Sequence, residues 1–162
     1  MTVSRIPIVL ALAFAANATL AAAADVAFVG PPGWSHVGQQ SPDQTRTFDQ
    51  WKLGGGGGDP AQTVTFISDS TSSYTDTLAL IKKNFADNHI KASADDDMAC
   101  HGQQAHVIQF SSGPEGKEII IRRILVPQGP KGLVTITYAR AKDDPDDADV
   151  QKSIATFCKA TS

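Results

Sequence analysis

The sequence predicts an α+β fold, an α/β/α sandwich in which two main amphipathic helices cover a central antiparallel sheet. Three strand patterns follow one another directly, over Ala105–Ser111, Glu118–Pro127 and Leu133–Ala141. Because the loops between them are short and rich in turn residues, neighbouring strands should pair antiparallel. The second strand is apolar on both faces, which is typical of a central strand covered on both sides. Two helical stripes elsewhere in the chain would provide that cover.

The first 24 residues have the parts of a secretory signal peptide. Arg5 precedes a mostly apolar run, Ile6–Ala16, and Ala22-Ala23-Ala24 forms a small-residue cleavage site. The apolar run is shorter than the ~20 residues of a membrane-spanning helix. We therefore expect cleavage after Ala24, a single domain over residues 25–162, a secreted or periplasmic protein and no stable membrane anchor after cleavage.

The segment after the signal peptide is predicted to begin with a short apolar strand, Val26–Val29, that stops at a Pro-Pro-Gly turn. Trp34 follows the turn and is expected to pack in the core, since tryptophan buries a large area. Gln39–Asp43 is polar and is expected to form a loop.

Two further strands are predicted at Thr45–Leu53 and Ala61–Ser68, where β-prone and apolar residues recur. Five glycines, Gly54–Gly58, lie between them. They lack the Lys-Ser/Thr of a phosphate loop and precede a strand, so they predict a hairpin loop. In the last predicted strand, Leu133–Ala141, apolar residues alternate with Thr135 and Thr137, which indicates that one of its faces is wetter.

The first amphipathic helix is predicted to follow Ser73, which with Asp76 matches a weak capping box. Its apolar stripe runs from Tyr74 to Phe85, and the helix should end near Asn88. The next segment, Ile90–Met98, is ambiguous, because its three consecutive aspartates fit a solvated turn or a cation site.

The second helix is predicted to begin with Asp144 as its N-cap and Pro145 as its first helical residue. Val150, Ile154 and Phe157 form its buried stripe. The residues predicted to form the core of the whole domain are Trp34, Phe48, Phe66, Leu78, Ile81, Phe85, Ile120, Ile124, Val134, Ile136, Ile154 and Phe157.

Two cysteines, Cys100 and Cys158, remain after signal cleavage, and an even count in an oxidising compartment predicts a disulfide. Closing so long a loop stabilises the fold by roughly 4 kcal/mol on the chain-entropy account. The alternative is a metal site that uses Cys100 with His101 and His106. Zinc sites usually take about four ligands at short recurring spacings, and this spacing does not match them, so no metal or other cofactor is predicted.

Arg122 and Arg123 lie in the middle of a strand otherwise made of Ile, Leu and Val, and they point to opposite faces. One of them must pair with an acid, extend past the strand, or reach an open face where a partner docks. A salt bridge to Asp76 or Glu118 is the simpler explanation. With Arg140, these two arginines are nevertheless the candidate binding residues.

The export signal, the closed sandwich pattern and the lack of an assembled catalytic constellation predict a non-enzymatic protein that docks on another protein. The net charge of −3 and the dispersed basic residues argue against nucleic-acid binding. No Gly-x-Ser-x-Gly elbow is present, and the four histidines are scattered along the chain. The alternative is a metal-dependent or histidine-based hydrolase of the periplasm or extracellular space that uses His101 or His106.

The order of these elements resembles the PsbP-like family, which includes small bacterial exported proteins. The resemblance covers nearly the whole chain after the signal peptide and implies an antiparallel sheet between helices. It also implies a binding or assembly module, since no catalytic motif carries over. The landmarks are the strand before Pro-Pro-Gly-Trp34, the strand around Phe48, the strand Val64–Ser68, the helix Tyr74–Phe85, the segment Gly102–Ala105, and Ser153–Phe157 in the closing helix.

Overall fold

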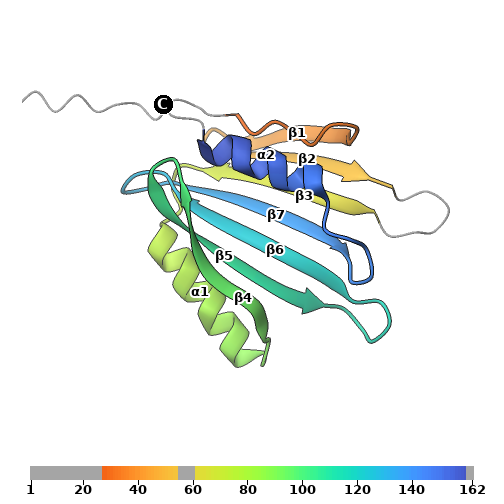
Figure 1. Cartoon of the computed structure of the whole chain (residues 1–162). Coiled ribbons are helices and arrows are strands. Elements are labelled where there is room, and N and C mark those ends of the chain that lie inside the picture. The colour runs from red at the N-terminus through yellow and green to blue at the C-terminus, as the bar shows by residue number, and fades with distance from the viewer. Residues whose placement is uncertain (1–26, 55–60, 160–162) are drawn as a thin grey trace, which may run out of the picture.

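The computed structural model describes residues 27–54 and 61–159 (Figure 1). The predicted signal peptide and most of the glycine run lie outside these ranges. Seven antiparallel strands form one sheet in the order β1-β2-β3-β7-β6-β5-β4. The strands are β1 (Ser35–Asp43), β2 (Arg46–Leu53), β3 (Gln62–Asp69), β4 (Ala92–Cys100), β5 (Gln103–Ser112), β6 (Ile119–Pro127) and β7 (Leu133–Ala141). The helices are α1 (Tyr74–Asp87) and α2 (Ala148–Lys159).

The predicted α/β/α sandwich with two main helices is wrong: this is a mainly β fold. Helix α1 has 14 residues, none of them buried, and α2 has 12 residues, of which three are buried. Seven strands spaced by about 4.8 Å make a sheet roughly 30 Å wide, whereas a helix is only about 10 Å across. Each helix therefore covers only a part of one sheet face.

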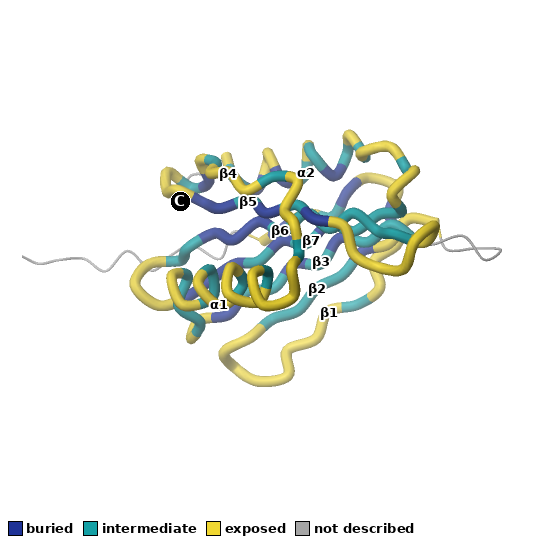
Figure 2. Tube along the Cα trace, turned by 90° about the horizontal axis from the view of Figure 1, so that it is seen from below, coloured by how far each residue is buried: buried dark blue, intermediate teal, exposed yellow. Residues whose placement is uncertain are grey.

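The two helices lie on opposite faces of the sheet (Figure 2). Phe85 of α1 packs on Phe110 of β5, with ring centroids 4.8 Å apart. Phe157 of α2 packs on Phe66 of β3 at 5.6 Å. We name the two sides the α1 face and the α2 face. Because side chains alternate along a strand, adjacent residues of β6 belong to different faces.

The predicted three-strand stretch is confirmed as β5, β6 and β7, which pair consecutively. Two strands were missed, and both lie at the sheet edges. The aspartate-rich segment is β4 rather than a turn, and the predicted loop Gln39–Asp43 is part of β1. Edge strands expose both faces to water, so their sequences lack a clear apolar alternation. Residues 27–30 form no strand, although Phe28 is buried.

The main core lies between α2 and the sheet, where Phe157 contacts both Phe66 and Phe28. Of the predicted core residues, the buried ones are Trp34, Phe66, Ile124, Val134, Ile136, Ile154 and Phe157. The remaining five are only partly buried, and they are Phe48, Leu78, Ile81, Phe85 and Ile120. The α1 stripe therefore covers the sheet without forming a closed core.

The predicted cap of α1 is confirmed, because the Asp76 backbone N–H donates to Ser73 Oγ at 3.3 Å. The predicted start of α2 is wrong: the helix begins at Ala148, three residues later than predicted. Asp147 Oδ1, rather than Asp144, accepts hydrogen bonds from the backbone N–H groups of Asp149 (2.8 Å) and Val150 (3.1 Å). The sequence offers several aspartates that can cap a helix, and the loop geometry selects the last one.

The predicted disulfide is confirmed: Cys100 and Cys158 are bonded, with their Cα atoms 4.2 Å apart. It joins the end of β4 to the last turn of α2, and Cys100 is fully buried. The His101 backbone N–H also donates to the Cys158 carbonyl at 3.0 Å. Across the residues that the structure describes, neither helix has the length and apolar character needed to cross a membrane.

Candidate binding surface

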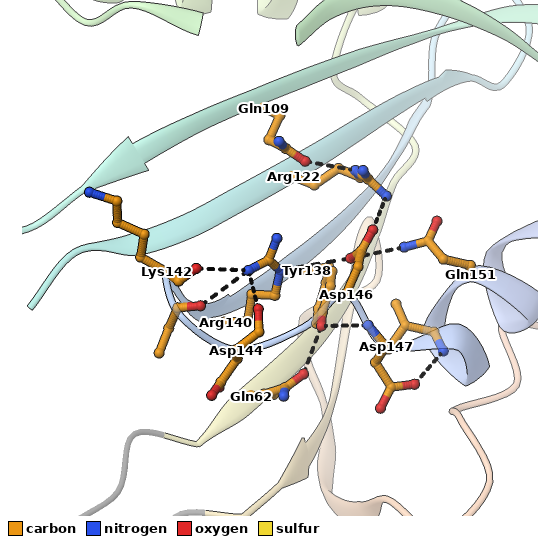
Figure 3. Close-up of polar contacts among 12 residues, drawn as sticks. Gln62, Gln109, Arg122, Tyr138, Arg140, Lys142, Asp144, Asp146, Asp147 and Gln151 are labelled. Atoms are coloured by element: carbon orange, nitrogen blue, oxygen red, sulfur yellow. Dashed lines mark hydrogen bonds and ion pairs between the residues drawn. The ribbon is translucent and has the colours of Figure 1, made fainter. Parts of the chain in front are cut away.

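Arg122 lies on the α2 face, and the structure pairs it internally (Figure 3). Its Nε donates to Gln109 Oε1 at 3.1 Å, and its Nη1 lies 3.3 Å from a carboxylate oxygen of Asp146. The pairing acid is therefore Asp146, in the loop before α2, and the predicted pairing with Asp76 or Glu118 is wrong. Arg122 is engaged in holding that loop against the sheet.

Arg140 is engaged in the same way (Figure 3). Its Nε lies 3.8 Å from Asp146. Its Nη1 donates to three backbone carbonyls of the following loop, those of Ala141 (3.2 Å), Lys142 (3.3 Å) and Asp144. Since these donors are occupied by the loop, Arg140 serves the fold rather than a partner.

Tyr138 completes this polar cluster. Its hydroxyl donates to Gln62 Oε1 at 2.7 Å and accepts from the Asp147 backbone N–H at 3.2 Å. Burial raises the pKa of Tyr138, so the hydroxyl stays neutral and keeps its proton for Gln62. The cluster connects β3, β7 and the start of α2, and its side chains mainly satisfy one another.

The two histidines of the alternative metal site lie on different sides of the sheet. His101 lies at the turn between β4 and β5, and its ring is 4.6 Å from that of Phe157 on the α2 face. His106 lies on the α1 face between two aspartates of β4. Cys100 is bonded to Cys158 and therefore offers no thiolate to a metal ion. Within residues 27–54 and 61–159, no group of three His, Cys, Asp or Glu side chains is placed to hold a metal ion.

His106 is a buried polar residue, and it connects β5 to the edge strand β4. Its Nδ1 lies 2.7 Å from Asp97 Oδ1, and its Nε2 lies 2.7 Å from Asp95 Oδ1 without hydrogen-bond alignment. The hydrogen bond with His106 lowers the pKa of Asp97. Lys82 of α1 approaches Asp95 at 3.7 Å, so the cluster also links the helix to the edge strand.

A cleft of about 370 Å³ lies where the β5–β6 loop meets the end of β7. Lys142 and Glu118, both of which line it, form an ion pair at 3.3 Å. The remaining lining comes from the loop and from the ends of β6 and β7. Since the two charged groups at its centre neutralise each other, the cleft is a weaker candidate than the sheet face described next.

Arg123, the neighbour of Arg122 along β6, lies on the α1 face and has no partner in the part of the chain that the structure describes. No carboxylate of the described residues lies within ion-pairing distance of it, and its side chain makes no hydrogen bond to them. Its Nε is buried and unsatisfied. Burial lowers the pKa of Arg123, although an arginine remains charged at neutral pH. Of the three arginines considered from the sequence, this one is unsatisfied.

A row of polar residues crosses the sheet beside Arg123. Arg123 pairs with Thr137, Thr137 with Thr65, and Thr65 with Gln50. On the other side, Arg123 pairs with Ile108, which in turn pairs with Asp95. Helix α1 packs against β6, and its Lys82 reaches Asp95 of β4, so the helix covers this row from β4 to β6 and the residues on β7, β3 and β2 lie beyond it.

A second row, parallel to the first, contributes apolar side chains to the same area. Ile67 pairs with Phe48 on one side and with Thr135 on the other. Phe48 and Ile67 are both partly exposed. We call the area made of Phe48, Gln50, Thr65, Ile67, Arg123 and Thr137 the open sheet face. It belongs to the half of the α1 face, on β2, β3 and β7, that α1 leaves uncovered (Figure 2).

The charge of the open sheet face differs from that of the whole chain. The chain carries a net charge of −3, but the basic residues Arg123 and Lys52 project on this side of the sheet without an ion pair among the described residues. The acid at this side of β3, Asp69, is occupied by Arg46 at 2.6 Å. This surface is therefore locally positive.

Sequence reasoning identified Arg123 as a candidate but did not predict the surface around it. The alternation of Thr135 and Thr137 with apolar residues was the available signal. The row also depends on how β3 and β2 align with β7, and that register is set by contacts between distant parts of the chain.

These features define a class: a small, mainly β protein with a seven-stranded antiparallel sheet and a half-open face. No family model and no curated protein matches the sequence. Among solved structures, the chain is similar to a protein of unknown function, PA94 from Pseudomonas aeruginosa, which is described as a candidate regulator. The TM-score is 0.50 at 15% identity, over 76% of this chain and 90% of that one. The likeness is one of fold.

Proposed function

We propose that this protein is an exported, non-enzymatic accessory module that docks on another protein through the open sheet face. The observation that carries the proposal is the juxtaposition of two partly exposed apolar residues, Phe48 and Ile67, with an unpaired arginine on an uncovered sheet face. Apolar side chains provide area to bury on association, and a polar row beside them gives orientation.

The sheet edges are poorly suited to bind a partner, which favours the face. β4 carries three consecutive aspartates, and exposed charges of one sign oppose the addition of another strand. β1 contains Pro42, and its pairing with β2 has two register shifts. Such irregularities interrupt the free row of backbone groups that a docking strand would need.

The charge of the surface points to an acidic partner. Arg123 and Lys52 are basic, and the nearby Asp69 is already paired with Arg46. Electrostatic complementarity of this kind raises association rates and selects against basic partners.

Export is supported by the signal-peptide pattern of the sequence and by a buried disulfide, which persists in oxidising compartments. The resemblance to the PsbP-like family, in which binding and assembly roles are general, agrees with an accessory role, as an argument from analogy. The intact mass of protein recovered from an exporting host should correspond to residues 25–162. An uncleaved chain in the membrane fraction would contradict export with cleavage.

Site-specific photo-crosslinking tests the docking surface. A photoreactive phenylalanine analogue placed at Thr65, in the native organism, should give a discrete adduct with one protein. The matched control carries the same analogue at Thr156, on the exposed side of α2, and should not give that adduct. Equal adducts from both positions, no adduct from Thr65, or an adduct made only of two copies of this chain would each contradict the proposal.

A further inference from the structure

We infer that Arg123, together with the Thr137 hydroxyl, forms a subsite for one carboxylate side chain, an Asp or Glu, of the docking protein. This inference rests on the proposed function and names the chemical group that the open sheet face recognises.

The geometry brings a donor fork and a hydroxyl together. Arg123 and Thr137 are directly opposite on β6 and β7, and directly opposite residues have their Cβ atoms about 4.5–5.5 Å apart. Only Nε of Arg123 is both buried and unsatisfied, so the two Nη nitrogens keep contact with solvent. A carboxylate that approached from the open side could accept from the guanidinium in the bidentate arrangement that arginine favours.

The energetic argument comes from what Arg123 lacks. Removing a charged group from water without a partner costs free energy, and proteins rarely leave a partly buried arginine unpaired. Arg122, the adjacent residue, is paired with Asp146 and Gln109 in the usual way. A bound carboxylate would give Arg123 an ion pair like the one that Asp146 gives Arg122. In the complex, this ion pair would offset the free-energy cost of partly burying the Arg123 guanidinium.

The surroundings favour a single carboxylate over a phosphate or a nucleic-acid backbone. The row beside Arg123 continues with the neutral residues Thr137, Thr65 and Gln50. The other base on this side that has no ion pair among the described residues, Lys52, lies opposite Thr63, in the next row along the strands. One guanidinium balances one unit of negative charge, whereas phosphate recognition usually employs several basic groups.

The test uses the Thr65 crosslinking protein in three backgrounds. Arg123→Lys keeps the charge but removes the planar fork, and should lower the yield of adduct about tenfold or more, as expected when a charged hydrogen bond is lost. Thr137→Val should lower it by a smaller factor. The control, Lys152→Met, removes an exposed charge from α2 on the other face of the sheet and should change the yield less than twofold. Thermal unfolding of each variant checks that it is folded.

A second readout follows Arg123 directly. In NMR spectra of the purified protein, a blocked tripeptide Val-Glu-Val should shift the Arg123 Nε–H resonance saturably, while the Arg122 resonance stays in place. The same tripeptide with Gln in place of Glu should cause no shift, and neither should inorganic phosphate at equal concentration.

The outcomes separate the two proposals. An undiminished adduct in Arg123→Lys, or equal shifts with the Glu and Gln tripeptides, would overturn the carboxylate subsite and leave docking intact. A larger response to phosphate than to the Glu tripeptide would likewise overturn it. Absence of any Thr65 adduct in the unmodified background would instead refute the docking proposal itself.

Discussion

The two faces of the sheet are built differently, although the same strands supply both. On the α2 face, a short helix contributes three buried residues, an aromatic cluster and a disulfide, and its polar groups are paired within the loop before α2. On the α1 face, the helix buries none of its residues fully, and half of the sheet is left uncovered. The difference indicates that the α2 face supplies most of the stability, so that half of the α1 face can remain open.

The contrast is sharpest within one strand. Arg122 and Arg123 are adjacent and chemically identical, and they face opposite sides. Arg122 meets Asp146 and Gln109, whereas Arg123 meets no acid among the described residues. What distinguishes them is the cover that each face receives, and the predictions below test that distinction.

The largest effect is expected for Phe157→Ala on the α2 face. Phe157 is 3% exposed and contacts the rings of Phe28 and Phe66, so the truncation leaves a cavity in the main core. We expect a loss of about 3–5 kcal/mol in the free energy of unfolding, measured by chemical denaturation. A loss below about 1 kcal/mol would mean that the α2 face is not the stable one.

Removal of the disulfide should come next. In the double variant Cys100→Ala, Cys158→Ala, the tie between β4 and α2 is lost, and we expect a decrease of about 2–4 kcal/mol in the free energy of unfolding. The unmodified protein measured with and without reductant is the control. The variant should show no dependence on reductant, and a persisting dependence would contradict the bond.

Asp69 stabilises the junction between β3 and α1 through its charge. Burial tends to raise the pKa of Asp69, but hydrogen bonds from Thr71, Arg46 and Ser72 outweigh this and hold the pKa well below its usual range. A carboxyl whose pKa is depressed on folding stabilises the fold above its unfolded value of about 3.9, and the contribution is lost as the pH falls through the folded value.

We therefore expect Asp69→Asn to cost about 1–3 kcal/mol at neutral pH, since it removes charged hydrogen bonds at a buried site. The cost should diminish below about pH 4, where the wild-type carboxyl begins to lose its advantage. Denaturation at several pH values measures this. A cost that is constant down to about pH 2 would show that the charge of Asp69 contributes nothing.

Phe85→Ala on the α1 face should have a smaller effect than the matched Phe157→Ala. Phe85 packs edge-on against Phe110 but is partly exposed, so less area is lost and the site can rehydrate. We expect about 1–2 kcal/mol rather than the 3–5 typical of a buried aromatic, in the same denaturation experiment. Equal losses for the two phenylalanines would remove the distinction between the faces.

The parts of the fold that follow local rules were predictable. Short turn-rich loops specify the pairing of β5, β6 and β7, and the Ser73 cap marks the start of α1. Two cysteines that follow a signal-peptide pattern predict their own bond. Edge strands were not predictable, because a strand such as β4 that is wet on both faces carries no apolar alternation. The fold class failed for a related reason, since an amphipathic stripe does not say how much of a sheet a helix covers.

The candidate site was predictable only in part. The sequence placed Arg122 and Arg123 on opposite faces and required one of them to pair with an acid, extend past the strand or reach an open face. Which of them meets Asp146 depends on the path of the loop before α2, which is fixed by Tyr138 and Arg140 in three dimensions. The sequence therefore identified the pair of arginines but not the one that remains unpaired.

The smallest expected effect on stability is that of Arg123→Met, and it is the most informative. Methionine has a similar length and no charge, so it removes an unpaired, partly buried guanidinium without leaving a cavity. We expect a change within about 0.5 kcal/mol, or a slight gain in stability. The matched variant Arg122→Met leaves Asp146 and Gln109 without their partner and should lower the free energy of unfolding by about 1–2 kcal/mol. Chemical denaturation of the pair measures both values, and a larger loss for Arg123→Met than for Arg122→Met would show that Arg123 stabilises the free protein. An arginine that costs the free protein stability and is nevertheless present is best explained by its use in a complex.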